Sequence, residues 1–411
     1  MKSSFISEFK EREYYNQCTN LEELSNLMNN KKINAYIGFD CTAKSLHVGS
    51  LLQIMCLRML QKHGHRPIVL LGGGTTMVGD PSGKEETRKI LSKKEINENI
   101  NSIKKIFNVF LDNTNTKTRP IFVNNLEWLG KLNYIKFLRD IGKHFTINKM
   151  LSFDSVKLRL DREQSLSYME FNYMILQAYD FLELNKKKKC VLQIGGSDQW
   201  GNIINGVDLI KRHSSQQVYG LTTPLITLAS GSKMGKTEKG AVWLDKKLLS
   251  PYDYWQFWRN TDDRDVIKFL KMFTDIKLSE IENIKGKNIN ELKIILANET
   301  TTMLHGKLSS NKAAETARKT FSSGLFGSEL PSIKLNKYKF EDGFNIVDLV
   351  VETKFLDSKS EVRRLINNSG IKVNNEVVKH DKIKISLLDF KDNVLKLSRG
   401  KKKHLIIKII P

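Results

Sequence analysis

Short apolar runs alternate with longer amphipathic stretches through the first half of the chain. The short runs have the length and polar borders that are typical of buried strands, and they cover residues 34–40, 67–71, 120–123 and 190–194. Between the first two, residues 51–61 carry apolar side chains at helical spacing. Strands that alternate with helices predict an α/β fold, in which helices cover both faces of a parallel sheet.

Polar and glycine-rich segments follow the predicted strands, at residues 40–50, 72–83 and 195–199. In open parallel sheets, ligands bind outside the carboxyl ends of the strands. We therefore expect these three segments to build one ligand site.

The chain carries 67 Lys+Arg against 45 Asp+Glu, a formal charge of +22. A basic surface of this size favours a nucleic-acid partner, although excess lysine can also simply solvate a surface. No run approaches the ~20 apolar residues of a membrane span, so we expect no membrane partner. The amino terminus has no apolar core, which predicts a cytoplasmic protein. Cys18, Cys41, Cys56 and Cys190 are scattered, so neither a zinc site nor a disulfide framework is expected.

The rest of the chain changes character twice. Residues 246–326 read as helical, and residues 327–344 form a polar segment that contains Pro331. Residues 345–411 hold fifteen basic and eight acidic side chains, a net charge of +7. We expect an α/β domain at 1–245, a helical domain, a linker and a small basic domain.

Two common phosphate motifs fail in this sequence. The glycines from Gly72 do not complete GxGxxG, because Met77 occupies the last position. The segment before Lys236 lacks the first glycine of a Walker A loop, since position 230 is Ser. A different pair fits a nucleotide better. His47 and Gly49 follow a strand and open a helix, whose amino terminus favours phosphate, while Lys233 and Lys236 lie in a Gly/Ser-rich loop downstream.

A second group of polar residues has helical spacing. Tyr173, Gln177 and Asp180 stand at i, i+4 and i+7 and therefore share one helix face. Such a face can simply meet water. A phenol, an amide and a carboxylate together are equally suited to holding a small polar ligand.

Longer motifs carry a resemblance that extends over nearly the whole chain. They are Tyr36-Ile-Gly-Phe-Asp40, Gly79-Asp-Pro-Ser-Gly-Lys84, Tyr173-x3-Gln177-Ala-Tyr-Asp180, Gln193-Ile-Gly-Gly-Ser-Asp198-Gln-Trp200, Lys233-Met-Gly-Lys236-Thr237 and Asn260-Thr-Asp-Asp-Arg-Asp265. In these the chain resembles bacterial-type tyrosyl-tRNA synthetases, a class I family, with an altered form of the HIGH and KMSKS pair. The resemblance implies a Rossmann-like catalytic domain, a helical anticodon-binding domain and a carboxyl-terminal α+β RNA-binding module.

The resemblance also implies a substrate set and roles for individual residues. The expected partners are L-tyrosine, ATP with Mg²⁺, tRNA(Tyr) and a second copy of the chain, with no tightly bound metal. Tyrosine would be held by Tyr36, Asp80, Tyr173, Gln177, Asp180 and Gln199. ATP would contact Gly38, Asp40, His47, Gly49, Ser50, Asp198 and Lys236. Thr42, His47, Lys84, Arg88, Lys233 and Lys236 would stabilise the reacting phosphates.

The carboxyl-terminal segment resembles the small RNA-binding module that a ribosomal protein and many pseudouridine synthases share. There, Arg363, Arg364, Lys401, Lys402 and Lys403 are expected to meet RNA phosphates.

Three departures from the family pattern stand out. Ser50 replaces the second His of the first motif, Cys41 replaces a proline and is expected to loosen its turn, and Gly235 and Thr237 replace the serines of KMSKS. A synthetase descendant that only binds RNA is the alternative function. A tryptophan enzyme is the nearest enzymatic rival, and the Tyr36–Asp180 pair argues against it.

Overall fold

The computed structural model describes residues 4–80, 91–231, 234–237, 240–322, 331–391, 393–400 and 403–410. The chain forms two compact units, Met1–Gly306 and Lys307–Pro411. The predicted division at 245, 326 and 344 is finer than this and stays a prediction.

The first unit is built on a six-stranded sheet. Its strand order is β1-β6-β5-β2-β3-β4. The bounds are β1 Gln17–Cys18, β2 Asn34–Asp40, β3 Arg66–Gly72, β4 Ile121–Asn124, β5 Cys190–Gly196 and β6 Tyr219–Thr223. All neighbours pair in parallel except β1, which is antiparallel to β6. The predicted α/β class and its central strands are confirmed.

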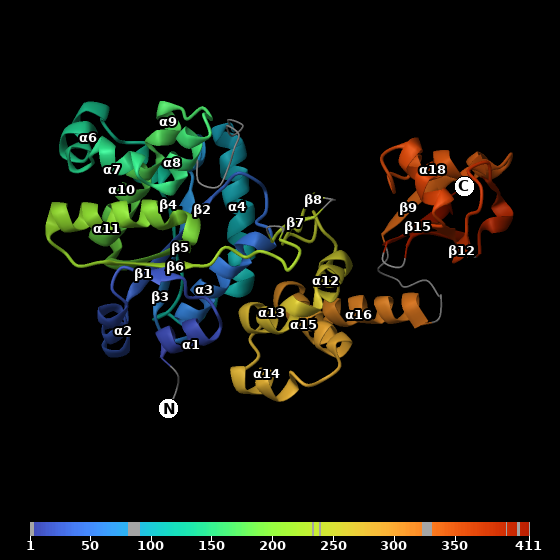
Figure 1. Cartoon of the computed structure of the whole chain (residues 1–411), viewed down its shortest axis with the longest axis horizontal. Helices are drawn as coiled ribbons and strands as arrows, with labels where there is room; N and C mark the ends of the chain where they lie inside the picture. The colour runs from blue at the N-terminus through green and yellow to red at the C-terminus, as the bar shows by residue number, and fades with distance from the viewer. Residues whose placement is uncertain are drawn as a thin grey trace. The chain divides into compact units, whose positions relative to one another are not determined.

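Helices cover both faces of this sheet (Figure 1). The helices α3 (Leu51–Lys62) and α4 (Lys93–Phe110) lie on one side, and α10 (Tyr173–Lys188) and α11 (Trp200–Ser214) on the other. In α4, apolar side chains from Ile96 to Phe110 recur at helical spacing and are buried. Its amino terminus is closed by a capping box between Ser92 and Glu95.

The parallel strands deliver their polar ends to one edge. Asp40, the last residue of β2, pairs with Gly72, the last residue of β3. On the α10 face, Tyr36 of β2 packs against Phe181, with ring centroids 5.3 Å apart. This places the segments that follow β2, β3 and β5 around a common opening.

A helical segment completes the first unit. It contains α12 (Pro251–Arg259), α13 (Val266–Phe273), α14 (Leu278–Ile284) and α15 (Ile289–His305). The N-terminal segment is tied to it, because the buried Arg12 guanidinium donates to the carbonyls of Lys271, Thr274 and Ile276 at 2.8–3.1 Å. Tyr14 adds a 2.6 Å bond to the carbonyl of Met272.

The second unit begins with α16 (Lys307–Ser322) and continues into a five-stranded sheet of order β12-β11-β14-β15-β9. Its strands are β9 Ser332–Asn336, β11 Ile371–Val373, β12 Glu376–Val377, β14 Val394–Arg399 and β15 Lys403–Ile410. Leu349 of α17 (Ile346–Glu352) and Val362 of α18 (Lys359–Asn367) share a buried core with the sheet. The expected linker thus contains β9, which pairs with β15. No helix among the described residues is long and apolar enough to span a membrane.

We predict that Arg12→Met lowers the free energy of unfolding by about 3 kcal/mol. The substitution leaves three carbonyls without their donor. It also removes the guanidinium 2.7 Å from the Glu8 carboxylate, which keeps its 2.8 Å contact with His63 Nε2. Urea unfolding measures the change. The control is Lys31→Met, which removes an exposed charge and is expected to stay within about 0.5 kcal/mol of wild type. Equal stability of the two variants would contradict the role given to Arg12.

Candidate active site

A cavity of about 300 Å³ opens at the carboxyl ends of β2, β3 and β5. It brings together most of the predicted tyrosine and ATP residues from distant parts of the chain. The predicted residues that line it are Tyr36, Gly38, Asp40, Gly49, Ser50, Asp80, Tyr173, Gln177, Asp180, Asp198 and Gln199. The helix face of Tyr173 and Asp180 therefore meets this cavity and not bulk water.

Asp180 forms the floor of the cavity with only 1% of its surface exposed. Its two carboxylate oxygens accept hydrogen bonds from Asn125 Nδ2 at 2.9 Å and from Trp128 Nε1 at 2.7 Å. Burial raises the pKa of Asp180 from 3.8 to about 7, and the two donors act against that rise. The carboxylate is therefore held in place by neutral donors and has no cationic partner among the described residues.

Tyr36 lies beside this carboxylate with 1% of its surface exposed. Burial, followed by the nearby Asp180 charge, raises the pKa of Tyr36 well above its ordinary value. Its hydroxyl has no hydrogen-bond partner within the described part of the protein, and neither does Gln193 Oε1. Buried polar atoms in native proteins are nearly always paired. Both residues line the cavity, so a ligand with its own polar group fits there.

A chain of hydrogen bonds joins the floor of the cavity to its mouth. Asn125 Nδ2 donates to Thr75 Oγ1 at 3.0 Å as well as to Asp180, and Thr75 donates to Asp40 Oδ1 at 2.9 Å. The Tyr173 hydroxyl donates to the other Asp40 oxygen at 3.2 Å. Thr75, Asn125 and Trp128 were not among the residues predicted from the sequence. Their positions in the sequence could have indicated them, because Thr75 lies three residues after the end of β3 and Asn125 comes directly after β4.

A second polar group lies where β5 leads into α11. Gln199 Nε2 donates to Asp80 Oδ2 at 2.9 Å and to Asp198 Oδ2 at 3.3 Å. Asn202, one turn into α11, donates to Gln199 Oε1 at 3.1 Å and orients the amide. Three predicted residues from two distant segments are thus in direct contact.

The His47 turn and the lysine loop meet at the mouth of the cavity. Gly49 N donates to His47 Nδ1 at 3.0 Å, just before α3 begins. Gly235 has φ +105°, and a Cβ there would lie 2.7 Å from His47 Nδ1 and 2.9 Å from Gly49 N. A Cβ on Gly49 would in turn lie 2.9 Å from the Met234 carbonyl oxygen. Neither glycine can carry a side chain while the two segments stay in this contact.

The turn at Cys41 is held tightly, so the expectation that this residue loosens it is wrong. Cys41 N donates to Thr76 Oγ1 at 2.8 Å, and the Cys41 carbonyl accepts from Asn99 Nδ2 at 2.8 Å. Both backbone groups are therefore fixed without a proline. Burial raises the pKa of the Cys41 thiol to about 12, which keeps it protonated and unreactive.

Several predicted residues within the described part of the chain do not line this cavity. Thr42 is exposed beyond Cys41, and Arg363 and Arg364 are exposed on α18 in the second unit. Lys403 opens β15. Lys84, Arg88, Lys233, Lys401 and Lys402 lie outside the described residues, as does the side chain of Lys236. Among the described residues, no group of three or more His, Cys, Asp or Glu could hold a metal ion.

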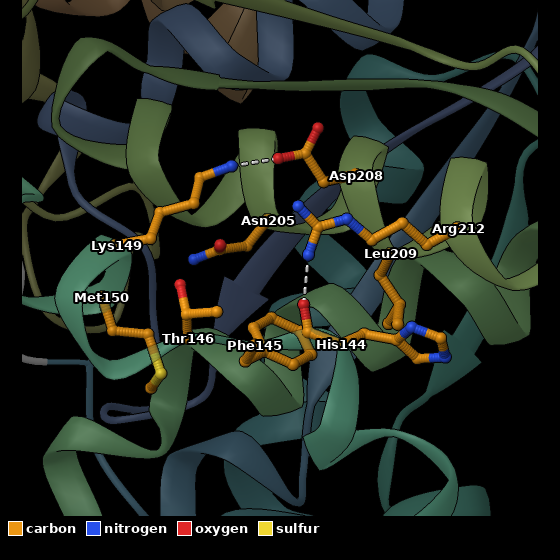
Figure 2. Close-up of a pocket in the computed structure, with 9 residues that line it drawn as sticks. All are labelled: His144, Phe145, Thr146, Lys149, Met150, Asn205, Asp208, Leu209 and Arg212. Atoms are coloured by element: carbon orange, nitrogen blue, oxygen red, sulfur yellow. Dashed lines mark hydrogen bonds and ion pairs between the residues drawn. The ribbon is translucent and has the colours of Figure 1, made fainter.

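A separate hollow lies between α7 (Ile147–Leu151) and α11 (Figure 2). Its space of about 10 Å³ suits one water molecule. Lys149 and Asp208 form an ion pair across it, and the Asn205 amide nitrogen has no partner among the described residues. No predicted site residue from the described ranges lines this hollow.

Comparison with known proteins agrees with this geometry. Residues 28–322 match the family described as tRNA synthetases class I (W and Y). Residues 323–407 match the tyrosine--tRNA ligase SYY-like C-terminal domain. The tyrosine--tRNA ligase of Pelagibacter ubique is 67% identical over 99% of this chain and 100% of its own length. The chain belongs to the tyrosyl-tRNA synthetase family.

Further relatives support the same assignment. The tyrosine--tRNA ligase of Rickettsia bellii is 50% identical to this synthetase over 99% of the chain and 100% of its own length. A solved structure, the C-terminally truncated mitochondrial tyrosyl-tRNA synthetase of Aspergillus nidulans, matches with a TM-score of 0.71 and 30% identity. That match covers 78% of this chain and 95% of the other. The predicted family and the Rossmann-like class I fold are confirmed.

We predict that Asp180 makes the stability of the synthetase depend on pH. Because the pKa of Asp180 is raised from 3.8 to about 7, the folded state holds the proton more tightly. The resulting stabilisation is complete below pH ~3.8 and is lost as the pH rises through about 7. Relative to Asp180→Asn, the wild type should lose stability over this range, as measured by urea unfolding at several pH values.

The control is Asp161→Asn, which removes an exposed carboxylate from the same unit. Its stability should follow that of the wild type across the pH range. Parallel curves for wild type and Asp180→Asn would show that the Asp180 pKa is not raised.

Proposed function

We propose that this chain activates L-tyrosine with ATP to form tyrosyl-adenylate and then transfers the tyrosyl group to the 3' terminal ribose of tRNA(Tyr). The observation that carries the proposal is the buried Tyr36 hydroxyl, which has no partner within the described residues and lies beside the Asp180 carboxylate. A tyrosine phenol supplies both an acceptor for Tyr36 and a donor for Asp180.

Selectivity for tyrosine follows from this pair. Phenylalanine would leave the buried Tyr36 hydroxyl unpaired and would add no donor to Asp180, whose oxygens already accept from Asn125 and Trp128. An unpaired buried hydroxyl costs more binding free energy than an unfilled apolar contact. A discrimination of ~10⁵ without editing is the magnitude that the tyrosine enzyme itself illustrates.

We assign the other end of the amino acid to the mouth of the cavity. Asp80, Tyr173 and Gln177 hold the ammonium group, a task suited to a carboxylate and polar oxygens. Asp40 and Gln199 orient the carboxylate of the amino acid toward ATP. The bonds of Asp40 to Thr75 and Tyr173, and of Gln199 to Asp80, support these assignments because they fix the geometry before substrate arrives.

ATP is assigned to the opening between the His47 turn and the start of α11. Gly38 and Gly49 allow close approach of the nucleotide, Ser50 and Asp198 meet the ribose, and His47 and Thr42 meet phosphate oxygens. Lys84, Arg88, Lys233 and Lys236 supply the cations that stabilise charge on the departing pyrophosphate. Mg²⁺ enters with ATP as part of the substrate.

The reaction then needs no protein nucleophile. The tyrosine carboxylate attacks the α-phosphorus of ATP, and pyrophosphate leaves. A ribose hydroxyl of the tRNA next attacks the carbonyl of the mixed anhydride, and AMP leaves. The protein contributes positioning and electrostatic stabilisation.

The tRNA is assigned to the helical segment 246–326 and to the basic module 345–411, with Arg363, Arg364 and Lys401–Lys403 at its phosphates. A second copy of the chain is the proposed partner of an apolar surface on the short helices between residues 134 and 169. Nine large apolar side chains are exposed there: Tyr134, Ile135, Leu138, Ile147, Leu151, Leu158, Leu160, Tyr168 and Met169. The cytoplasmic location stays a prediction.

We expect ATP–pyrophosphate exchange with tyrosine and with none of the other nineteen amino acids. The Tyr36→Phe variant should lose about tenfold in discrimination against phenylalanine, the value of one hydrogen bond. Its stability without substrate should not fall, because none of the residues that the structure describes pairs with the deleted hydroxyl. Absence of exchange from folded wild-type protein would favour the RNA-binding descendant instead.

We expect a chain that ends at Ser322 to retain ATP–pyrophosphate exchange with tyrosine and to lose tRNA charging. This cut removes β9 together with β15, so it leaves no unpaired edge strand behind. In the full chain, the double variant Arg363→Ala/Arg364→Ala serves as a milder control that should weaken charging only. Equal loss of exchange and charging in the shortened chain would contradict this division of labour.

A further inference from the structure

The loop that carries Lys233 and Lys236 starts just after Ala229, and the peptide groups of Ala229 are held on both sides. Ala229 N donates to Asp265 Oδ2 at 2.8 Å. The Arg264 guanidinium donates to the Ala229 carbonyl at 3.3 Å. Both partners come from η5 (Asp263–Asp265), a turn of the helical segment that is distant in sequence. The motif around this turn has no part in the site described above.

Asp265 is not simply a helix cap. It occupies the N-cap position of α13, where aspartate ordinarily accepts a bond from the first turn of its own helix. Its side chain makes no such bond, and only 7% of the residue is exposed. The carboxylate is thus directed to Ala229, in a charge-assisted hydrogen bond that is stronger than a neutral one.

The η5 turn is itself firmly placed. Asp262 accepts from Arg264 N at 3.0 Å and from Arg264 Nε at 2.9 Å, which orients the guanidinium. At the far end of α13, Asp275 pairs with Arg58 of α3 at 3.0 Å. Since α3 begins at the His47 turn, the helical segment is tied to the same helix whose amino terminus faces the cavity.

The other end of the loop is fixed to the His47 turn. Met234 N donates to the Ile226 carbonyl at 2.9 Å, and Val242 N donates to the Gly235 carbonyl at 3.1 Å. Val48 N then donates to the Val242 carbonyl at 2.9 Å. The Asp265 contact is therefore the anchor at the first end of a loop whose second end lies against His47.

We propose that Asp265, supported by Arg264, is a positioning residue for the nucleotide reaction. It holds the base of the lysine loop through Ala229 and couples the helical segment to the ATP side of the cavity. The coupling rests on the proposed function, in which this loop acts on the phosphates of ATP. Anchorage of Ala229 is a property of the fold and holds independently of that function.

The test compares three substitutions in the full chain. Asp265→Ala removes the acceptor, Asp265→Asn keeps an oxygen for Ala229 N, and Asp263→Ala removes a neighbouring carboxylate that pairs with Lys293 and not with Ala229. For Asp265→Ala we expect about tenfold faster hydrogen exchange at the Ala229 amide. The kcat of pyrophosphate exchange should fall by about ten- to a hundredfold, the cost of a misplaced reacting group. The KM for tyrosine should stay within about twofold. Asp265→Asn, which keeps a neutral acceptor, should lose clearly less kcat than Asp265→Ala, and Asp263→Ala should behave as wild type.

Each alternative result has a defined meaning. If hydrogen exchange at the Ala229 amide is unchanged in Asp265→Ala, Asp265 does not anchor Ala229. If the amide exchanges faster but the kcat of pyrophosphate exchange is unchanged, Asp265 does not position the loop for the reaction. A parallel rise in the KM for tyrosine would indicate general damage and would also overturn the positioning role. If Asp265→Ala does not fold, Arg264→Ala replaces it, with an expected loss of about threefold in kcat because that bond is long and exposed. Wild-type protein that shows no ATP–pyrophosphate exchange would refute the proposed function. Hydrogen exchange at the Ala229 amide would still show whether Asp265 anchors Ala229.

Discussion

The buried Asp180 carboxylate constrains the architecture around the cavity. A carboxylate without a cationic partner is tolerated in a protein interior only when its oxygens are hydrogen-bonded. Asn125 and Trp128 supply those bonds from the segment that follows β4, so this segment must close over α10. The Asn125 amide in turn fixes Thr75 and, through it, Asp40 at the mouth. One buried carboxylate thereby links the ends of three strands and fixes the floor of the cavity relative to its mouth.

Much of this arrangement could be predicted from the chain alone. The apolar runs that became β2, β3, β4 and β5 are short and bounded by polar residues, and their alternation with helices fixes a parallel sheet. Tyr36, Asp180 and Tyr173 could be assigned because they belong to long motifs. Their burial could not, since a helix face of the same composition can equally meet water, and only the packing of α10 on the sheet decides between the two.

The residues that escaped prediction share a physical character. Asn125 and Trp128 each donate to Asp180, more than fifty positions away, and Asn125 also donates to the distant Thr75. No local periodicity in the sequence reports such long-range bonds. The expectation that Cys41 loosens its turn was wrong for a related reason. Its turn is stabilised by Thr76 and Asn99 from outside, so the local loss of a proline says little about its rigidity. The strand β9 was hidden in a polar segment because its pairing partner, β15, lies at the other end of its unit.

The contact between Gly49 and Gly235 has a consequence for how the sequence can change. Each glycine leaves the room that the other segment fills, so a side chain at either position meets the backbone or the His47 ring across the contact. Replacement of one glycine therefore changes which side chains are tolerated at the other. The effects of the two substitutions on stability are not additive, as those of independent sites are. Two positions far apart in the chain thus form a single epistatic unit, and a library that varies one while fixing the other samples only part of the accessible sequences.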